Sequence, residues 1–153
     1  MTTPADYVLQ LQTHMTVSPL IDAFQVIEQK TWPDRGYVRI RMTLHNGDFL
    51  EVAEYFVLEG DELVPHRYRY QWMDGERQRL RRRWDNIEHY PGLPAFPHHV
   101  HIGDEQCVEP SHRLSILDLL RTLSDEIAGD ELRDTPSSRI TEARAAYRDR
   151  AAL

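Results

Sequence analysis

The 153-residue sequence predicts an α+β fold, in which a meander of four or five antiparallel strands has an N-terminal and a C-terminal helix packed on one face. Three observations support this prediction. Apolar and polar residues alternate through much of the first half of the chain, as in half-buried strands. Asn46-Gly47 and Asp74-Gly75 are dipeptides preferred in two-residue hairpin turns. Apolar residues at helical spacing occur near the beginning of the chain and again after residue 115.

The first element is a helix that begins near residue 5. Val8, Leu11 and Met15 recur at helical spacing, and Ser18-Pro19 ends the helix, because a residue that precedes proline avoids the helical conformation. A strand is expected over residues 24–29, followed by a turn.

Residues 37–44 give the clearest strand pattern, with every second side chain apolar. The return strand, 49–58, places Glu54 on its apolar side, so this carboxylate must lie at a bulge, have a buried partner or serve a function. Strands at 63–73 and 77–84 follow. Their arginines alternate along the chain, so we expect the two strands to share an arginine-bearing face.

The second half ends in another helix. Residues 99–102 are expected to add a short edge strand. The later helix, 116–127, begins after a Ser115 cap and is expected to stop at Gly129. We therefore assign residues 1–129 to one α+β domain and residues 130–153 to a peripheral extension, with a further helix at 138–150.

An unusual loop connects the arginine-bearing strands to residues 99–102. Residues 83–101 contain four histidines and three prolines, and the prolines prevent a continuous helix. We interpret this stretch as an ordered loop that displays imidazoles, the alternative being a surface turn that happens to contain histidines. In an extended backbone, His99 and His101 face one way and His98 faces the other.

Composition excludes several classes of function. A net charge of −7 argues against a general nucleic-acid coat protein, although residues 67–83 hold seven arginines against two acids. No apolar run is long enough to span a membrane, and the N-terminus does not resemble a secretory signal. The single cysteine, Cys107, allows no internal disulfide, so we expect a cytoplasmic protein.

The histidines and arginines together suggest RNA cleavage, which is one of two functions that the sequence allows. Cleavage without a metal needs a base for the 2′-hydroxyl proton, a cation at the phosphate and an acid for the leaving oxygen. The predicted acid–base residues, with a carboxylate to orient them, are His89, His98, His101 and Asp85. The predicted substrate-binding residues are Arg69, Arg81, Arg83 and Tyr70.

We predict no metal and no other cofactor, because the spacing of the histidines matches no helix-borne zinc motif. A metal site remains the less favoured alternative, since imidazole suits zinc, nickel and copper. The second function is a non-catalytic interaction module, in which the histidine-rich loop docks a partner protein. Whether the chain is an enzyme therefore stays open at this point.

The sequence also resembles a known family, the TumE toxins of bacterial and archaeal toxin–antitoxin modules. The resemblance rests on Tyr-Arg-Tyr-Gln-Trp at 68–72, Arg-Trp-Asp-Asn at 83–86, His89 and Phe-Pro-His-His-Val-His at 96–101. It covers about residues 5–127. The chain departs from the family pattern at Gln71, where a histidine is usual, and at residues 87–90.

The resemblance implies a toxin that is partnered by a small DNA-binding antitoxin. A cognate antitoxin is therefore the first expected partner, RNA is the second, and no membrane is expected. The sequence leaves the oligomeric state open, and a homodimer is one of the alternatives.

Overall fold

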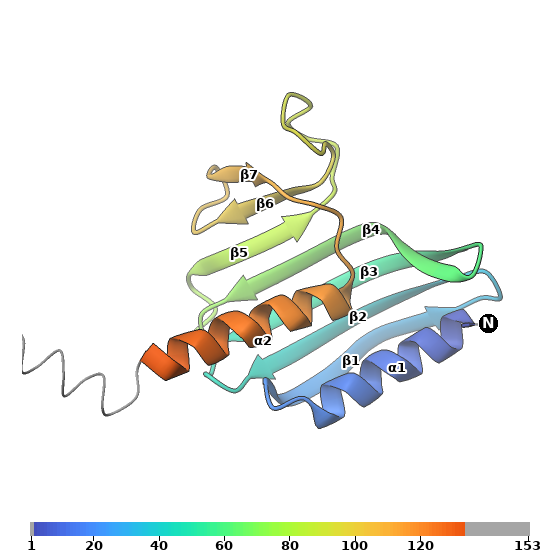
Figure 1. Ribbon diagram of the computed structural model, residues 1–153, viewed down its shortest axis with the longest axis horizontal. Coiled ribbons are helices and arrows are strands. Elements are labelled where there is room, and N and C mark those ends of the chain that lie inside the picture. Colours follow the sequence, from blue (N-terminus) through green and yellow to red (C-terminus); the bar gives the residue numbers. More distant parts are fainter. Residues whose placement is uncertain (1, 134–153) are drawn as a thin grey trace, which may run out of the picture. The chain divides into compact units, whose positions relative to one another are not determined.

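The computed structural model of the chain describes residues 2–133 (Figure 1). The chain divides into two compact units, residues 1–119 and 120–153. The elements are α1 (Pro4–Val17), β1 (Ile21–Thr31), β2 (Arg35–Leu44), β3 (Phe49–Glu59), β4 (Glu62–Met73), β5 (Leu80–Asp85), β6 (His99–Ile102), β7 (Val108–Pro110) and α2 (Ile116–Arg133). This confirms the α+β class and both helices.

All seven strands form one antiparallel sheet, in the order β1 to β7. The prediction of four or five strands was therefore wrong. The predicted edge strand, β6, pairs on both sides, because β7 lies beyond it. With four and three residues, β6 and β7 are too short for alternation to reveal them in the sequence.

Helix α1 begins at a capping box and ends as the sequence predicts. The Thr3 side chain accepts from the Asp6 backbone N–H, and the Asp6 carboxylate accepts from the Thr3 N–H, so two otherwise unpaired donors are satisfied. The helix ends at Val17, before the Ser18-Pro19 pair. It lies on one face of the sheet, over β1 to β3, and buries the predicted apolar stripe (Figure 1).

Glu54 is the polar exception on this helix-covered face of the sheet. It is fully buried and accepts hydrogen bonds from the hydroxyls of Tyr7 and Tyr70 and, at 3.0 Å, from the backbone N–H of Ile116. Of the alternatives that the sequence left open, Glu54 is thus the paired one. These bonds connect α1, β3, β4 and the first turn of α2. Burial raises the pKa of Glu54 above its ordinary value, although the three donors act against the shift.

The second helix starts where predicted but does not stop at Gly129. Ser115 and Asp118 form a reciprocal cap, with backbone-to-side-chain distances of 3.1 and 3.2 Å. The helix continues to Arg133, since one glycine costs a helix only about 1 kcal/mol. The helix predicted at 138–150 lies outside the described residues. Within residues 2–133, no helix is both long and apolar enough to cross a membrane.

Candidate functional site

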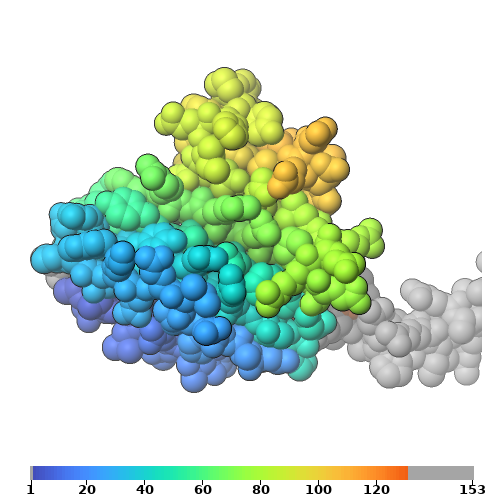
Figure 2. Space-filling model, turned by 180° about the vertical axis from the view of Figure 1, so that it is seen from behind, coloured from blue at the N-terminus to red at the C-terminus, as the bar shows by residue number. Residues whose placement is uncertain are grey.

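The face of the sheet opposite α1 carries two rows of side chains that are polar except for Ala53. Residues that are paired in register lie side by side, so these rows run across β2 to β6. One row is Arg41, Glu51, Gln71, Arg83 and His101, and the other is Arg39, Ala53, Arg69, Asp85 and His99. Figure 2 shows this side of the molecule, where strands coloured blue to green form the surface.

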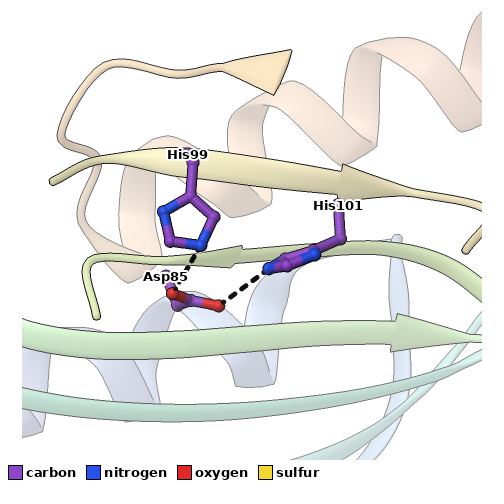
Figure 3. A group of neighbouring side chains, drawn as sticks. All are labelled: Asp85, His99 and His101. Atoms are coloured by element: carbon purple, nitrogen blue, oxygen red, sulfur yellow. Dashed lines mark ion pairs between the residues drawn. The ribbon is translucent and has the colours of Figure 1, made fainter. Parts of the chain in front are cut away.

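At the β5–β6 end of the rows, Asp85, His99 and His101 meet (Figure 3). The Nε2 atom of His99 lies 2.9 Å from Oδ1 of Asp85, and the Nε2 atom of His101 lies 3.4 Å from Oδ2. All three residues are buried, with at most 4% of their surface exposed. Asp85 ends β5 and the two histidines occupy alternate positions of β6, so the antiparallel register alone brings them together.

Backbone carbonyl groups fix the orientation of both imidazoles. Nδ1 of His99 lies 2.9 Å from the carbonyl oxygen of Pro97, and Nδ1 of His101 lies 2.6 Å from that of Glu105. A carbonyl oxygen can only accept, so each Nδ1 must carry the proton. Each Nε2 is then the ring nitrogen that is directed at Asp85.

Arg83 adds a cation next to this cluster. Its Nε lies 3.4 Å from Asp85 Oδ2, and its Nη1 donates to Glu105 at 2.8 Å. The Arg83 Nε is buried and has no hydrogen-bond partner among residues 2–133, because the approach to Asp85 lacks hydrogen-bond geometry. A buried N–H without a hydrogen-bond acceptor is unfavourable, although the nearby Asp85 carboxylate balances the charge of the guanidinium group.

The loop over residues 86–98 covers the cluster through Tyr90. The Tyr90 ring lies edge-on to His99 and to His101, with ring centroids 5.6 and 6.4 Å away. Asn86 anchors the start of the loop, because its side chain accepts from the Tyr68 N–H and donates to the His66 carbonyl. Tyr90 thus packs against both imidazoles of the cluster.

The structure brings together only some of the predicted acid–base residues. Asp85 and His101 are in the cluster, but His98 is not: it stacks on Tyr68, and its Nδ1 lies 2.8 Å from the Tyr68 hydroxyl, on the helix-covered face. Burial lowers the pKa of His98, and the charge of Arg113 adds to the shift. His89 is exposed in the loop, where its ring contacts Tyr90.

The predicted substrate-binding residues are also divided between the two faces. Arg83 borders the cluster, and Arg69 lies exposed in the row that contains Asp85. Arg81 forms an ion pair at 2.7 Å with the buried carboxylate of Asp48, outside both rows. Tyr70 is fully buried on the helix-covered face, so its ring cannot stack on a base.

His99 is the cluster residue that sequence reasoning did not select. The signal was present, because His99 and His101 have the two-residue spacing of one strand face. The sequence did not indicate that this face would meet Asp85.

A hollow of about 320 Å³ lies on the same face, over β2, β3 and β4. It is lined by Tyr37, Arg39, Phe49, Glu51, Ala53, Arg69 and Gln71. Partial burial acts to raise the pKa of Glu51, but hydrogen bonds from Arg41 and Arg39 hold that pKa below its ordinary value. Glu51 is thus an anion that orders Arg39, which lines the hollow, and Arg41, which lies outside its lining.

The fold and site define a class of protein: an α+β domain with one helix-covered sheet face and one polar face that ends in a buried histidine–aspartate cluster. The family model described as Toxin TumE matches residues 8–149, so the chain belongs to the TumE toxin family. This match confirms the resemblance that the sequence indicates. It extends to residue 149, beyond the end at about residue 127 that the sequence motifs predict. Comparison with curated proteins and with solved structures gave no significant match. A toxin of a toxin–antitoxin module has, in general, an antitoxin as its partner.

Proposed function

We propose that this toxin acts by cleaving RNA on its polar sheet face, with Asp85, His99, His101 and Arg83 at the point of cleavage. The observation that carries the proposal is the convergence of two imidazoles on one carboxylate, beside an arginine N–H that lacks an acceptor. These groups are the kinds that phosphodiester cleavage uses for proton transfer and for charge stabilisation.

The two rows supply a path for an unpaired RNA strand. Tyr37 and Phe49 offer aromatic surface for a base in the hollow, and Arg69 lines the hollow and pairs in register with Asp85 of the cluster. Neighbouring strands are about 5 Å apart, so β5 and β6 place the cluster about 5–10 Å beyond β4. A base in the hollow and a phosphate at Arg83 are compatible with that separation.

The sequence predicts cleavage without a metal. In such a mechanism, the residues of the cluster would have the following roles. With Nδ1 bound to a carbonyl, Nε2 is the atom of each imidazole that exchanges a proton with the substrate. One of His99 and His101 would accept the 2′-hydroxyl proton, and the other, in its protonated form, would donate a proton to the leaving 5′-oxygen. Arg83 stabilises the charge that develops on the phosphate. Tyr90 must move for the phosphate to enter, because Asp85 and both imidazoles are buried.

Exposed apolar side chains in the 86–98 loop favour a second candidate, a docking module without catalysis. Ile87, Tyr90 and Phe96 are 49, 43 and 39% exposed, which is typical of residues that a partner protein covers. In this case the histidines beneath Tyr90 would serve to hold the loop in place.

Incubation of the purified protein with total RNA, with and without a chelator, tests the proposal. The wild-type protein is expected to give defined fragments, and His101→Ala and Asp85→Asn are each expected to reduce their rate of formation by at least about 100-fold. His89→Ala is the matched control. It removes an exposed imidazole from the same loop and is expected to leave the rate unchanged.

Two results would overturn the nuclease assignment. The first is that a folded wild-type protein which still binds its antitoxin gives no fragments, either with or without the chelator. This result would favour the docking module. The other is undiminished cleavage by both His101→Ala and Asp85→Asn.

A further inference from the structure

Asp85, His99 and His101 form a set of three ligand atoms that converge on one point, although the sequence predicts no metal. Each residue offers one atom, and the three atoms lie no more than 4.8 Å from one another (Figure 3). A first-row transition ion binds nitrogen and oxygen ligands at about 2.0–2.2 Å, so adjacent ligands lie about 3–3.5 Å apart. Oδ1 of Asp85 lies 2.9 Å from Nε2 of His99, and Oδ2 lies 3.4 Å from Nε2 of His101, so each imidazole is already close to this spacing from one oxygen of the carboxylate.

The orientation of the rings adds to the geometric case. Both Nδ1 atoms lie within hydrogen-bonding distance of backbone carbonyl oxygens, so each Nε2 is the ring nitrogen that faces Asp85 and is available as a ligand atom.

We propose that Asp85, His99 and His101 bind a divalent first-row transition metal ion through one carboxylate oxygen and two Nε2 atoms. Two histidines with one carboxylate are a ligand set used for zinc and for non-haem iron. Imidazole ligands make Mg²⁺ a poor occupant, since that ion prefers oxygen. The carbonyls of Pro97 and Glu105 hold the rings in the orientation that coordination needs, as outer partners of metal-bound histidines commonly do.

Three protein ligands leave coordination positions for water or for a phosphate oxygen. A bound ion could therefore supply the Lewis acid or the activated water for phosphodiester cleavage. It would replace the metal-independent mechanism, because an Nε2 that is coordinated cannot also accept a proton. The proposal that the site binds a metal does not depend on the nuclease assignment, because metal binding is measured without RNA.

Calorimetric titration of the full chain with Zn²⁺, after removal of metals by chelator and dialysis, tests the inference. One equivalent is expected to bind, and Co²⁺ is expected to give the visible absorption of a site with nitrogen ligands. Mg²⁺ is expected to give no binding. Loss of a ligand in His99→Ala or His101→Ala is expected to weaken Zn²⁺ binding by more than about 100-fold. His98→Ala is the matched control, because it removes the adjacent histidine, which faces the opposite side of the sheet.

A measurement on the wild-type protein covers the case in which these variants fail to fold. Long-range ¹H–¹⁵N correlation spectra are expected to show that Zn²⁺ shifts the Nε2 resonances of His99 and His101 and leaves those of His98 unchanged. No binding by the folded wild-type protein would overturn the inference. So would binding that persists in the folded double variant His99→Ala/His101→Ala, since exposed histidines would then account for it.

Discussion

Glu54 is the residue on which the helix-covered side of the sheet most depends. It accepts from two tyrosine hydroxyls and one backbone N–H, and these donors come from three elements. A carboxyl that satisfies three buried donors stabilises the fold only as long as its own desolvation is offset. The site on the opposite face is built on the same strands, so their alignment there depends in part on this buried contact.

Substitution of Glu54 tests this assignment. Glu54→Ala removes the acceptor for three donors and leaves a cavity, so it is expected to lower the free energy of unfolding by about 2–5 kcal/mol. Glu54→Gln keeps an acceptor and most of the volume, and is expected to cost less. Urea denaturation measures both. Equal losses for the two variants would contradict the idea that the donors require an acceptor.

The pKa of Glu54 also predicts how stability depends on pH. Burial raises the folded-state pKa above the unfolded-state value of about 4.3. The contribution of Glu54 to stability is therefore full below that pH and is lost as the pH rises through the raised folded-state pKa. Over that interval, the wild-type protein is expected to lose more unfolding free energy than Glu54→Gln. Parallel curves for the two proteins would contradict this prediction.

Single residues show both what the sequence could reveal and what it could not. Alternation marked Glu54 as anomalous and placed His99 and His101 on one strand face, and both predictions follow from local geometry. The partners of Glu54 could not be predicted from local sequence patterns. Tyr7 is 47 residues from Glu54 and Ile116 is 62 residues away, and no periodicity identifies a contact across such a separation.

At the scale of elements, prediction succeeded where strands are long and hairpins are tight. β2, β3 and β4 each have ten or more residues, and their alternation is clear. β6 and β7 are short and follow an irregular loop, so only tertiary pairing defines them. The same limit applies to the site, because the contact between Asp85 and the two histidines is created by the pairing of β5 with β6.

The packing of β2 against β3 can be tested at Gly36. A Cβ atom at this position would lie 2.4 Å from the Phe56 ring, which is fully buried and cannot give way freely. Gly36→Ala is therefore expected to destabilise the protein by about 1–3 kcal/mol. Gly129→Ala is the contrast: it lies in α2 with open space around it and is expected to stabilise the helix by about 1 kcal/mol.

Thermal denaturation of both variants measures these effects. An unchanged or raised melting temperature for Gly36→Ala would show that β2 and β3 do not pack as described. A lowered value for Gly129→Ala would contradict a continuous helix through residue 129.

On the scale of the whole chain, the two faces of the sheet differ in chemical character. The face under α1 holds the apolar core and the paired Glu54, and the opposite face carries the arginine rows, the hollow and the Asp85–His99–His101 cluster. This division explains how an acidic protein with a net charge of −7 can still gather arginines on one face of its sheet. Family membership assigns the chain to the toxins, and the polar face is where we propose that its toxic chemistry occurs.

The most direct test of this account is the sequencing of RNA 5′ ends in bacterial cells that express the chain without an antitoxin. Wild-type expression is expected to arrest growth and to create new 5′ ends at defined positions. Asp85→Asn and His101→Ala, at equal levels of folded protein, are expected to create none, and His89→Ala is expected to match the wild type. Growth arrest without new RNA ends, or the same ends from the Asp85 and His101 variants, would contradict the account.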